Sequence, residues 1–285
     1  MASRRDYYQL TKPGIIRGNV MTTIAGFLLA SRGHISWSRL VLAIIGMSLV
    51  IGGACVSNNY LDRGIDRHME RTRKRAMVRG TISPQRALTF AAGLLIAGAV
   101  ALAFVNWISL ALGLFGVFAY VALYGLAKRR SVHGTLVGSI SGAIPIVTGY
   151  TAASGRLDGA AGLLFVVLTV WQMPHFYAIA IYRRQDYAAA GLPVLPVVRG
   201  IAAAKRQIIA YIAGFVVACT LLTILGYTGY VYLAIMLVVG LYWLKLALKG
   251  RRASDDNRWA KQVFGMSLAT LTVFSVVISV NWWLP

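Results

Sequence analysis

The sequence contains few of the residues on which disulfide, nucleotide-loop and serine chemistry depend. Only two of its 285 residues are cysteines, Cys55 and Cys219, and both fall in apolar stretches where we expect small packing side chains. Two isolated cysteines form neither a disulfide framework nor a metal-ligand pattern. There is also no glycine-rich phosphate loop and no Ser-His-Asp arrangement. These absences argue against a disulfide-stabilised scaffold, a nucleotide-loop enzyme and a serine hydrolase.

Charged residues are also few, whereas hydrophobic residues are abundant. Charged side chains make up 13% of the chain and hydrophobic ones 58%, which is typical of a polytopic membrane protein. Apolar windows of about 20 residues, the length that crosses a bilayer, predict nine spans. Their predicted ranges are 15–32, 39–60, 87–105, 107–127, 133–153, 160–182, 206–227, 229–248 and 261–281. We therefore expect a single all-α membrane domain over residues 1–285, with nine transmembrane helices around a central cavity.

Acidic residues are much rarer than basic ones. The chain has 8 acidic and 29 basic residues, which gives a net charge of +21. The basic residues are unevenly distributed. The N-terminal segment and every second loop hold 26 of the 29, and the opposite side of the predicted membrane holds 3. This positive-inside pattern places the N-terminus in the cytoplasm and the C-terminus outside. Because topology alone explains the basic charge, we expect no nucleic-acid partner.

Three oxygen-bearing side chains lie where the second apolar stretch meets a long basic segment. Asn58, Asp62 and Asp66 are four residues apart each time, so a continuing helix would place them on one face. Amide and carboxylate oxygens suit Mg²⁺, and carboxylates at a membrane boundary indicate function. A charged amphipathic helix resting at the lipid headgroups would show the same spacing. Spacing alone therefore leaves a metal site and a solvated helix equally open.

A weaker copy of this pattern follows the sixth apolar stretch. Asp186 closely follows Arg183 and Arg184, on the same predicted side of the membrane as Asp62. Folding that joins the two ends would form a chamber in which Mg²⁺ and basic side chains hold a diphosphate. We expect two pseudo-halves, 15–127 and 133–248, followed by the ninth helix. Such a chamber suits a substrate with an anionic head and a hydrocarbon tail.

Several motifs resemble those of the UbiA superfamily of intramembrane aromatic prenyltransferases, across nearly the whole chain. Asn58-x3-Asp62-x3-Asp66 is similar to its first signature, and Tyr124-x3-Lys128 to its Tyr/Lys element. The segments with the more specific resemblance are Leu10–Pro13 with Asn19, Asp62–Arg75, Trp171–Phe176 and Asp186–Pro196. Together they resemble the branch of the superfamily that farnesylates haem.

The resemblance implies a reaction and a set of site residues. Farnesyl diphosphate and haem b (protohaem IX) would be the substrates, and farnesyl transfer to the C2 vinyl group with water addition would give haem O and diphosphate. The implied catalytic residues and Mg²⁺ ligands are Asn58, Asp62, Asp66 and Asp186. The side chains implied to contact the diphosphate are Arg67, Arg71, Arg75, Tyr124, Lys128 and Arg184. The alternative is a prenyltransferase that acts on an aromatic quinone precursor.

The sequence departs from the superfamily pattern at two points. Ala190 stands where the second signature usually has a carboxylate, so Asp186 is the only acidic residue of that cluster. A second metal ion would therefore need another ligand, a water molecule or the diphosphate itself. Ala76 and Met77 follow Arg75 in place of the usual Pro-Leu, which is a detail of the loop.

Two histidines are candidates for contact with haem. His175 lies inside a predicted transmembrane helix, where an ionisable side chain normally has a partner or a purpose. Three roles remain open for it: iron ligation or porphyrin contact, a polar or proton-handling role, and a structural hydrogen bond. His133 opens the fifth predicted span beside Arg129 and Arg130, where solvation at the interface is the simpler interpretation.

Glycine recurs at every fourth position over Gly134, Gly138 and Gly142. Small residues at this spacing let two membrane helices approach closely. We therefore expect this face of the fifth span to pack tightly against a neighbour.

Two other classes of protein share parts of these patterns. A transporter would place ionisable residues near several midplanes, whereas here they are concentrated at one interface. A non-catalytic haem-binding or assembly scaffold would not need Asp62 and Asp66. The chain starts without a transit-like extension, so we expect the inner membrane of a bacterium. A haem A synthase or a terminal oxidase assembly is the protein partner to consider there.

Overall fold

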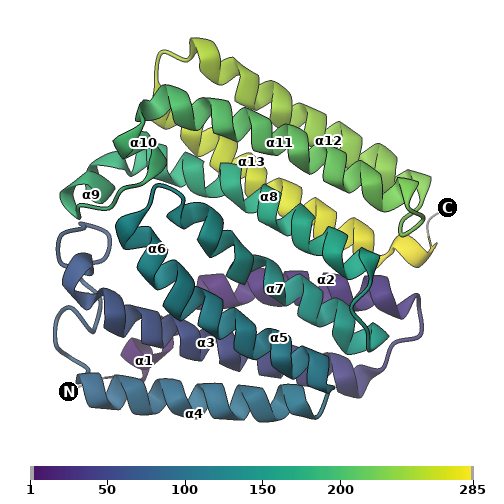
Figure 1. The fold of residues 1–285 in the computed structure, drawn as a ribbon, viewed down its shortest axis with the longest axis horizontal. Helices are drawn as coiled ribbons and strands as arrows, with labels where there is room; N and C mark the ends of the chain where they lie inside the picture. The colour runs from purple at the N-terminus through teal and green to yellow at the C-terminus, as the bar shows by residue number, and fades with distance from the viewer. Residues whose placement is uncertain (1–2, 284–285) are drawn as a thin grey trace.

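The computed structural model describes residues 3–283, and over that range the chain consists of helices and loops without any strand (Figure 1). The helices are α1 (Arg4–Leu10), α2 (Pro13–Ser31), α3 (Trp37–Asp66), α4 (Pro84–Ala103), α5 (Trp107–Phe118), η1 (Ala119–Leu123), α6 (Tyr124–Arg130), α7 (Gly134–Ser154), α8 (Gly159–Tyr182), α9 (Arg184–Ala189), α10 (Leu195–Val198), α11 (Gly200–Ile224), α12 (Tyr230–Lys249), η2 (Gly250–Arg252), α13 (Asp256–Ser279) and η3 (Asn281–Trp283). Met1 and Ala2, the start of the chain on which the bacterial expectation rests, lie outside this range.

Nine helical segments within residues 3–283 are long and apolar enough to cross a membrane, which confirms the predicted number. The segments α5, η1 and α6 form one span, Trp107–Arg130, and the other spans are α2, α3, α4, α7, α8, α11, α12 with η2, and α13. Large apolar side chains point away from the bundle: Phe104 and Trp107 are both 75% exposed. Apolar side chains left this exposed indicate lipid contact. The chain is a multi-pass membrane protein.

Helix α8 lies in the middle of the bundle, where it contacts α7, α11 and α13 (Figure 1). On the other side of the molecule, α3 packs against α4, and α2 packs against α7. The largest buried cluster joins α7, α8, α11, α12 and α13 around the rings of Phe215, Tyr232, Trp243 and Phe274. Edge-to-face pairs such as Phe215 with Trp243, 5.8 Å apart, give these rings defined geometry. This core fixes α8 relative to its neighbours.

Helix α3 is longer than the apolar stretch that predicted it. It runs for 30 residues, from Trp37 to Asp66. At 1.5 Å per residue this is about 45 Å, which exceeds the roughly 30 Å hydrocarbon core of a bilayer. The last turns of α3 therefore extend into the polar interface and carry Asn58 and Asp62 with them.

The predicted glycine face of α7 packs closely against α6 and α8, as expected. A Cβ atom at Gly134 would lie 2.7 Å from the Lys128 backbone, and one at Gly138 would lie 2.8 Å from the Tyr124 ring. A Cβ at Gly142 would overlap the side-chain amide of Gln172 in α8. These glycines therefore set how closely α6 approaches, and with it the positions of Tyr124 and Lys128.

Two adjoining cavities, of about 250 and 340 Å³, lie at the opposite end of the bundle from the end of α3. Both are lined by Leu29, Arg32 and Tyr227. They are separate from the chamber predicted beside Asp62.

Candidate active site

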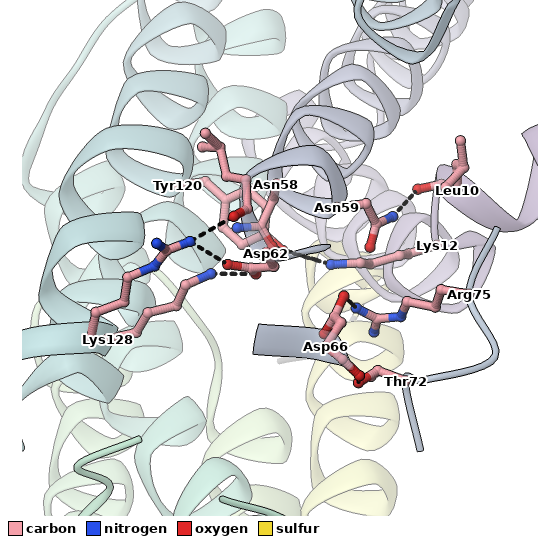
Figure 2. Close-up of polar contacts among 12 residues, drawn as sticks. Leu10, Lys12, Asn58, Asn59, Asp62, Asp66, Thr72, Arg75, Tyr120 and Lys128 are labelled. Carbon is pink, nitrogen blue, oxygen red and sulfur yellow. Dashed lines mark hydrogen bonds and ion pairs between the residues drawn. The ribbon is translucent and has the colours of Figure 1, made fainter. Parts of the chain in front are cut away.

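Asn58, Asp62 and Asp66 lie along one face at the end of α3, as the spacing predicts (Figure 2). Each has a basic partner from a different part of the chain: Lys12, Lys128 and Arg75 respectively (Figure 2). Four-residue spacing on a helix turns each side chain only about 40° from the last, which explains the common face. The solvated-helix alternative is disfavoured, because Asn58 and Asp66 are each only 2% exposed.

Asp62 is held by two cations from the end of α6. Lys128 donates to one carboxylate oxygen, and Arg129 donates to the other at 3.2 Å. The Asp62 and Lys128 side chains are 13% and 11% exposed, so solvent screens the pair only weakly. The Lys128 ammonium also lies 5.1 Å from the centre of the Tyr124 ring. Lys128, the basic residue of the Tyr/Lys element in α6, therefore contacts the carboxylate of Asp62 in α3 directly.

Asp66 is paired with the loop that follows α3. Arg75 donates to its carboxylate at 2.6 Å, and the Thr72 hydroxyl donates to its backbone carbonyl at 2.9 Å. The Asp66 side chain is 3% exposed and that of Arg75 is 25% exposed. The loop thus folds back over the end of α3 and brings a cation to a carboxylate that is otherwise buried.

Asn58 meets two groups that the sequence analysis did not single out as site residues. The Lys12 ammonium and the Tyr120 hydroxyl each lie 3.4 Å from the Asn58 amide oxygen, and 3.3 Å from each other. The Asn58 amide nitrogen is buried and has no hydrogen-bond partner among residues 3–283. A buried donor without a partner is unfavourable, and it fits a ligand oxygen bound at this point.

Lys12 adopts an unusual backbone conformation. Its φ angle is +54°, in the left-handed region, although it directly precedes Pro13, a position that normally favours extended backbone. Such strain costs about 1–3 kcal/mol and tends to persist at functional sites. Burial lowers the pKa of the Lys12 ammonium from its ordinary value, because the charged form loses hydration. In the sequence Lys12 stood out only as part of the motif at 10–13.

Tyr120 and Tyr124 form a stacked pair beside these groups. Their ring centroids are 5.7 Å apart and their planes differ by 15°. The π-helical turn η1 runs over Ala119–Leu123, between α5 and α6, so this backbone feature determines how the two rings face the end of α3. Short π-helical turns are frequent at functional sites. The only sequence signal for Tyr120 is its position four residues before Tyr124.

Asp186 lies on the short helix α9 and is not joined to the α3 row. Its only ion pair in the described part of the chain is with Arg183, at 3.8 Å. Burial raises the pKa of the neighbouring Tyr187, and the positive charge of Arg71 in the α3–α4 loop opposes that rise. Asp186 therefore forms no ion pair with the α3 row in the described part of the chain.

The remaining predicted site residues are mostly exposed. Arg67, Arg71 and Arg184 form no hydrogen bond or ion pair with residues 3–283 that would hold them in place. His133 is exposed at the start of α7, which agrees with interfacial solvation. The three arginines are therefore available to an incoming anion, whereas nothing in the fold connects His133 to the site.

His175 makes the structural hydrogen bond that was one of its three predicted roles. Its Nδ1 atom lies 2.8 Å from the Ser267 hydroxyl of α13. The ring lies 5.1 Å from that of Trp171, whose indole N–H donates to the Ser267 carbonyl at 2.9 Å. Helix α8 continues through Pro174, immediately before His175.

The α3 row fits Mg²⁺ by its chemistry. It offers one amide oxygen and two carboxylates, and each carboxylate already has a cation beside it. Mg²⁺ is commonly bound by one or two carboxylates together with substrate phosphates. Within residues 3–283 no three His, Cys, Asp or Glu side chains are grouped closely enough to hold a metal ion by themselves. The row therefore suits an ion that the substrate helps to bind.

Known proteins match this chain over nearly its whole length. The profile of the UbiA prenyltransferase family matches residues 19–271. Relatives named protohaem IX farnesyltransferase include one from Klebsiella pneumoniae subsp. pneumoniae, 49% identical, and one from Shigella flexneri, 48% identical. Each alignment of 283 residues covers 99% of this chain and 96% of the relative.

Solved structures share the arrangement of helices. One, of a digeranylgeranylglyceryl phosphate synthase in membranes, has a TM-score of 0.79 and is 20% identical, over 98% of both chains. Another is a UbiA homologue from Archaeoglobus fulgidus bound to GPP and Mg²⁺, with a TM-score of 0.69 and 15% identity over 96% of this chain and 99% of that one. At these low sequence identities, the structural similarity establishes that this chain shares their fold.

Proposed function

Because this chain belongs to the UbiA prenyltransferase family, we propose that it transfers the farnesyl group of farnesyl diphosphate to protohaem IX. The products are haem O, with a hydroxyethylfarnesyl group in place of the C2 vinyl group, and diphosphate. The observation that carries this assignment is 48–49% identity, over 99% of the chain, to proteins named protohaem IX farnesyltransferase. The same identity favours haem over a quinone precursor as the acceptor.

The end of α3 is the proposed diphosphate site. Asn58, Asp62 and Asp66 would hold Mg²⁺, with Asp186 as a further ligand from α9. When bound, the ion neutralises the diphosphate and makes it a better leaving group. The fold neighbour from Archaeoglobus fulgidus bound to GPP and Mg²⁺ supports this ion for the family.

Basic side chains around the row are placed to receive the diphosphate. Lys128 and Arg75 now neutralise Asp62 and Asp66, and a diphosphate would offer them oxygen atoms of higher charge. Arg67, Arg71 and Arg184 are exposed and supply further donors. Their positive charge stabilises the negative charge that develops on the leaving oxygen as the farnesyl C–O bond breaks.

The stacked tyrosines face the organic part of the reaction. When the C–O bond breaks, its electron pair stays on the diphosphate and an allylic cation remains. The faces of Tyr120 and Tyr124 stabilise positive charge and keep water away from the cation. The π electrons of the haem vinyl group then form the new C–C bond. Water adds to the resulting cation and loses a proton to solvent, so no covalent enzyme nucleophile is needed.

The charge distribution supports a diphosphate site at the cytoplasmic face of the membrane. The bacterial origin of the relatives supports a bacterial inner membrane as the location. The two carboxylate motifs end spans that run in the same direction, which supports pseudo-halves at 15–127 and 133–248. A haem A synthase or an oxidase assembly is the protein partner we propose to consume the product.

Product analysis tests the assignment of the acceptor. Purified protein in detergent is incubated with farnesyl diphosphate, Mg²⁺ and either haem b or an aromatic quinone-precursor acid. We expect mass spectrometry to detect haem carrying a farnesyl group plus one water, and no prenylated acid. Prenylation of the acid alone would keep the family and overturn the haem assignment. Prenylation of neither acceptor would favour a transporter or a scaffold.

A further inference from the structure

The two adjoining cavities lie at the end of the bundle where α13 finishes, opposite the α3 row (Figure 1). They are enclosed by the end of α2, the α7–α8 loop, the α11–α12 loop and η3. Arg32 and Tyr227 line both, and Arg156 lines the first. Their volumes of about 250 and 340 Å³ are close to the lower end of the range for small-molecule sites. The proposed farnesyl transfer uses none of these residues.

Arg32 is held beside the cavities in an unfavourable backbone conformation. Its φ angle is +44°, in the left-handed region that side chains other than glycine rarely adopt. The next residue, Gly33, packs against Trp282, because a Cβ atom there would lie 2.9 Å from that ring. The Arg32 guanidinium forms no hydrogen bond or ion pair with another residue in the range 3–283. Its donors are therefore available to a ligand in the cavities.

Arg156 also keeps donors available, because its carboxylate partner is shared. Its Nε atom donates to one oxygen of Asp158 at 3.1 Å, and the Tyr150 hydroxyl donates to the same oxygen at 2.9 Å. The backbone amides of Ala160 and Ala161 donate to the other oxygen at 3.1 and 3.2 Å. Within the described range, the terminal Nη groups of Arg156 have no partner. The carboxylate is thus fully used, and the end of the guanidinium is not.

The charge beside the cavities matches a phosphodiester. Arg32 and Arg156 against Asp158 leave one net positive charge, and a phosphodiester carries one negative charge. Guanidinium groups bind phosphate oxygens with paired hydrogen bonds. The Tyr227 hydroxyl, which has no hydrogen-bond partner in the range 3–283, is a third donor. No acidic side chain among those residues lines either cavity, so the lining offers no partner to the ammonium group of a zwitterionic headgroup.

Exposed aromatic side chains place the cavities at the level of lipid headgroups. Successive spans alternate in direction, so the starts of α3, α5 and α12 lie at the same end as η3. The exposed aromatic residues there are Trp37, Trp107, Tyr230 and Trp283. Tryptophan and tyrosine are enriched where a membrane protein meets the headgroups. A phosphate bound at this level is therefore within reach of the lipid leaflet.

We propose that these cavities bind the phosphate of an anionic phospholipid, which accepts hydrogen bonds from Arg32, Arg156 and Tyr227. The glycerol part of the headgroup occupies the cavities. Ile224 and Leu225, both exposed at the end of α11 beside the second cavity, give the acyl chains an apolar surface. No covalent bond forms or breaks. Because the bound phosphate joins the end of α2 to two loops of the other half, it stabilises this end of the bundle.

Binding is measured with the purified full chain in a neutral detergent. Phosphatidylglycerol, phosphatidylcholine or inorganic phosphate is added at equal concentrations. Native mass spectrometry gives the lipid-bound fraction, and thermal unfolding gives the midpoint, which rises when a ligand binds the folded state. We expect phosphatidylglycerol to bind at least about tenfold more tightly than either of the others, because it alone combines net negative charge with acyl chains.

Two substitutions of Arg32 test the site without relying on a single variant. Arg32→Gln should weaken phosphatidylglycerol binding by about tenfold or more, since a hydrogen bond from a charged group is lost. Arg32→Gly removes the same guanidinium but suits the positive φ angle. It should be at least as stable as the wild type without lipid, and gain less from phosphatidylglycerol. Arg39→Gln is the matched control, because Arg39 is exposed at the same end and lines neither cavity.

Unchanged phosphatidylglycerol affinity in both Arg32 variants would overturn the proposal. Equal binding of phosphatidylcholine would overturn the preference for an anionic lipid, and equal binding of inorganic phosphate would replace the lipid with a small anion. Equal weakening by Arg39→Gln would show diffuse charge attraction in place of a defined site. These measurements do not use farnesyl transfer, so their failure leaves the proposed function intact.

Discussion

Lys128 donates a hydrogen bond to Asp62 although 66 positions separate them in the chain. The pair joins α6 to the end of α3, and both side chains are nearly buried. A buried carboxylate is strongly unfavourable without a cation. The contact therefore serves the fold, because it neutralises Asp62, and it also places an ammonium group where the proposed diphosphate binds.

Replacing Lys128 with methionine should destabilise the protein and abolish most activity. Removal of one partner from a buried pair costs about 3–5 kcal/mol, and we expect the lower part of that range because Arg129 still contacts Asp62. Thermal unfolding in detergent measures the loss. The double variant Asp62→Asn with Lys128→Met removes both charges, so it should recover stability while remaining inactive. A double variant that recovered activity would contradict a role for either residue in the reaction.

Two substitutions of Lys12 should differ in stability but weaken substrate binding alike. Because its φ angle is +54°, glycine fits the backbone better than alanine, and Lys12→Gly should be more stable than Lys12→Ala by about 1 kcal/mol. Both variants lose the ammonium beside Asn58, so both should bind farnesyl diphosphate more weakly. Unfolding temperatures and the KM for farnesyl diphosphate test the two effects separately. An unchanged KM in both variants would remove Lys12 from the site.

The ring of Tyr120 should matter more than its hydroxyl. Tyr120→Phe keeps the stack with Tyr124 and loses only the long contacts to Lys12 and Asn58. Tyr120→Leu removes the ring face. A desolvated cation–π contact is worth about 2 kcal/mol, so kcat should fall by about 30-fold for leucine and much less for phenylalanine. Equal losses in the two variants would show that the hydroxyl is the important group.

Gly138 should be intolerant of even a methyl group. A Cβ atom there would lie 2.8 Å from the Tyr124 ring, so Gly138→Ala should displace that ring and Lys128 with it. Overpacking of this kind typically costs about 1–3 kcal/mol, and turnover should fall as well. Gly214→Ala in α11 is the matched control, because nothing lies within 4 Å of its added Cβ. That control should be neutral or slightly stabilising, and equal losses in both would refute the packing argument.

The spans and the α3 row could be predicted because each depends on residues close together in the sequence. A membrane helix requires a continuous apolar run, so hydropathy located all nine spans, with boundaries that differ from those of the structure by at most six residues. The common face of Asn58, Asp62 and Asp66 follows from helix geometry alone. The same holds for the glycine face at 134–142. Local periodicity was sufficient in each case.

The partners of the row could not be predicted, because they depend on how distant helices meet. Nothing in the sequence pairs Lys12 with Asn58, or chooses Lys128 over the many other basic residues as the partner of Asp62. The π-helical turn that orients Tyr120 has no recognisable sequence pattern. The spacing of Asp186 also did not reveal that it pairs with Arg183.

Product formation with and without Mg²⁺ tests whether the end of α3 is the diphosphate site of a metal-dependent farnesyl transfer. Farnesylated haem is quantified by mass spectrometry for the wild type with Mg²⁺ or with EDTA, and for Asp62→Asn and Glu70→Gln with Mg²⁺. Both variants remove one negative charge from the same region, but Glu70 is exposed and outside the row. We expect product from the wild type and Glu70→Gln with Mg²⁺, and almost none with EDTA or from Asp62→Asn. Undiminished product from Asp62→Asn, or in EDTA, would contradict this assignment.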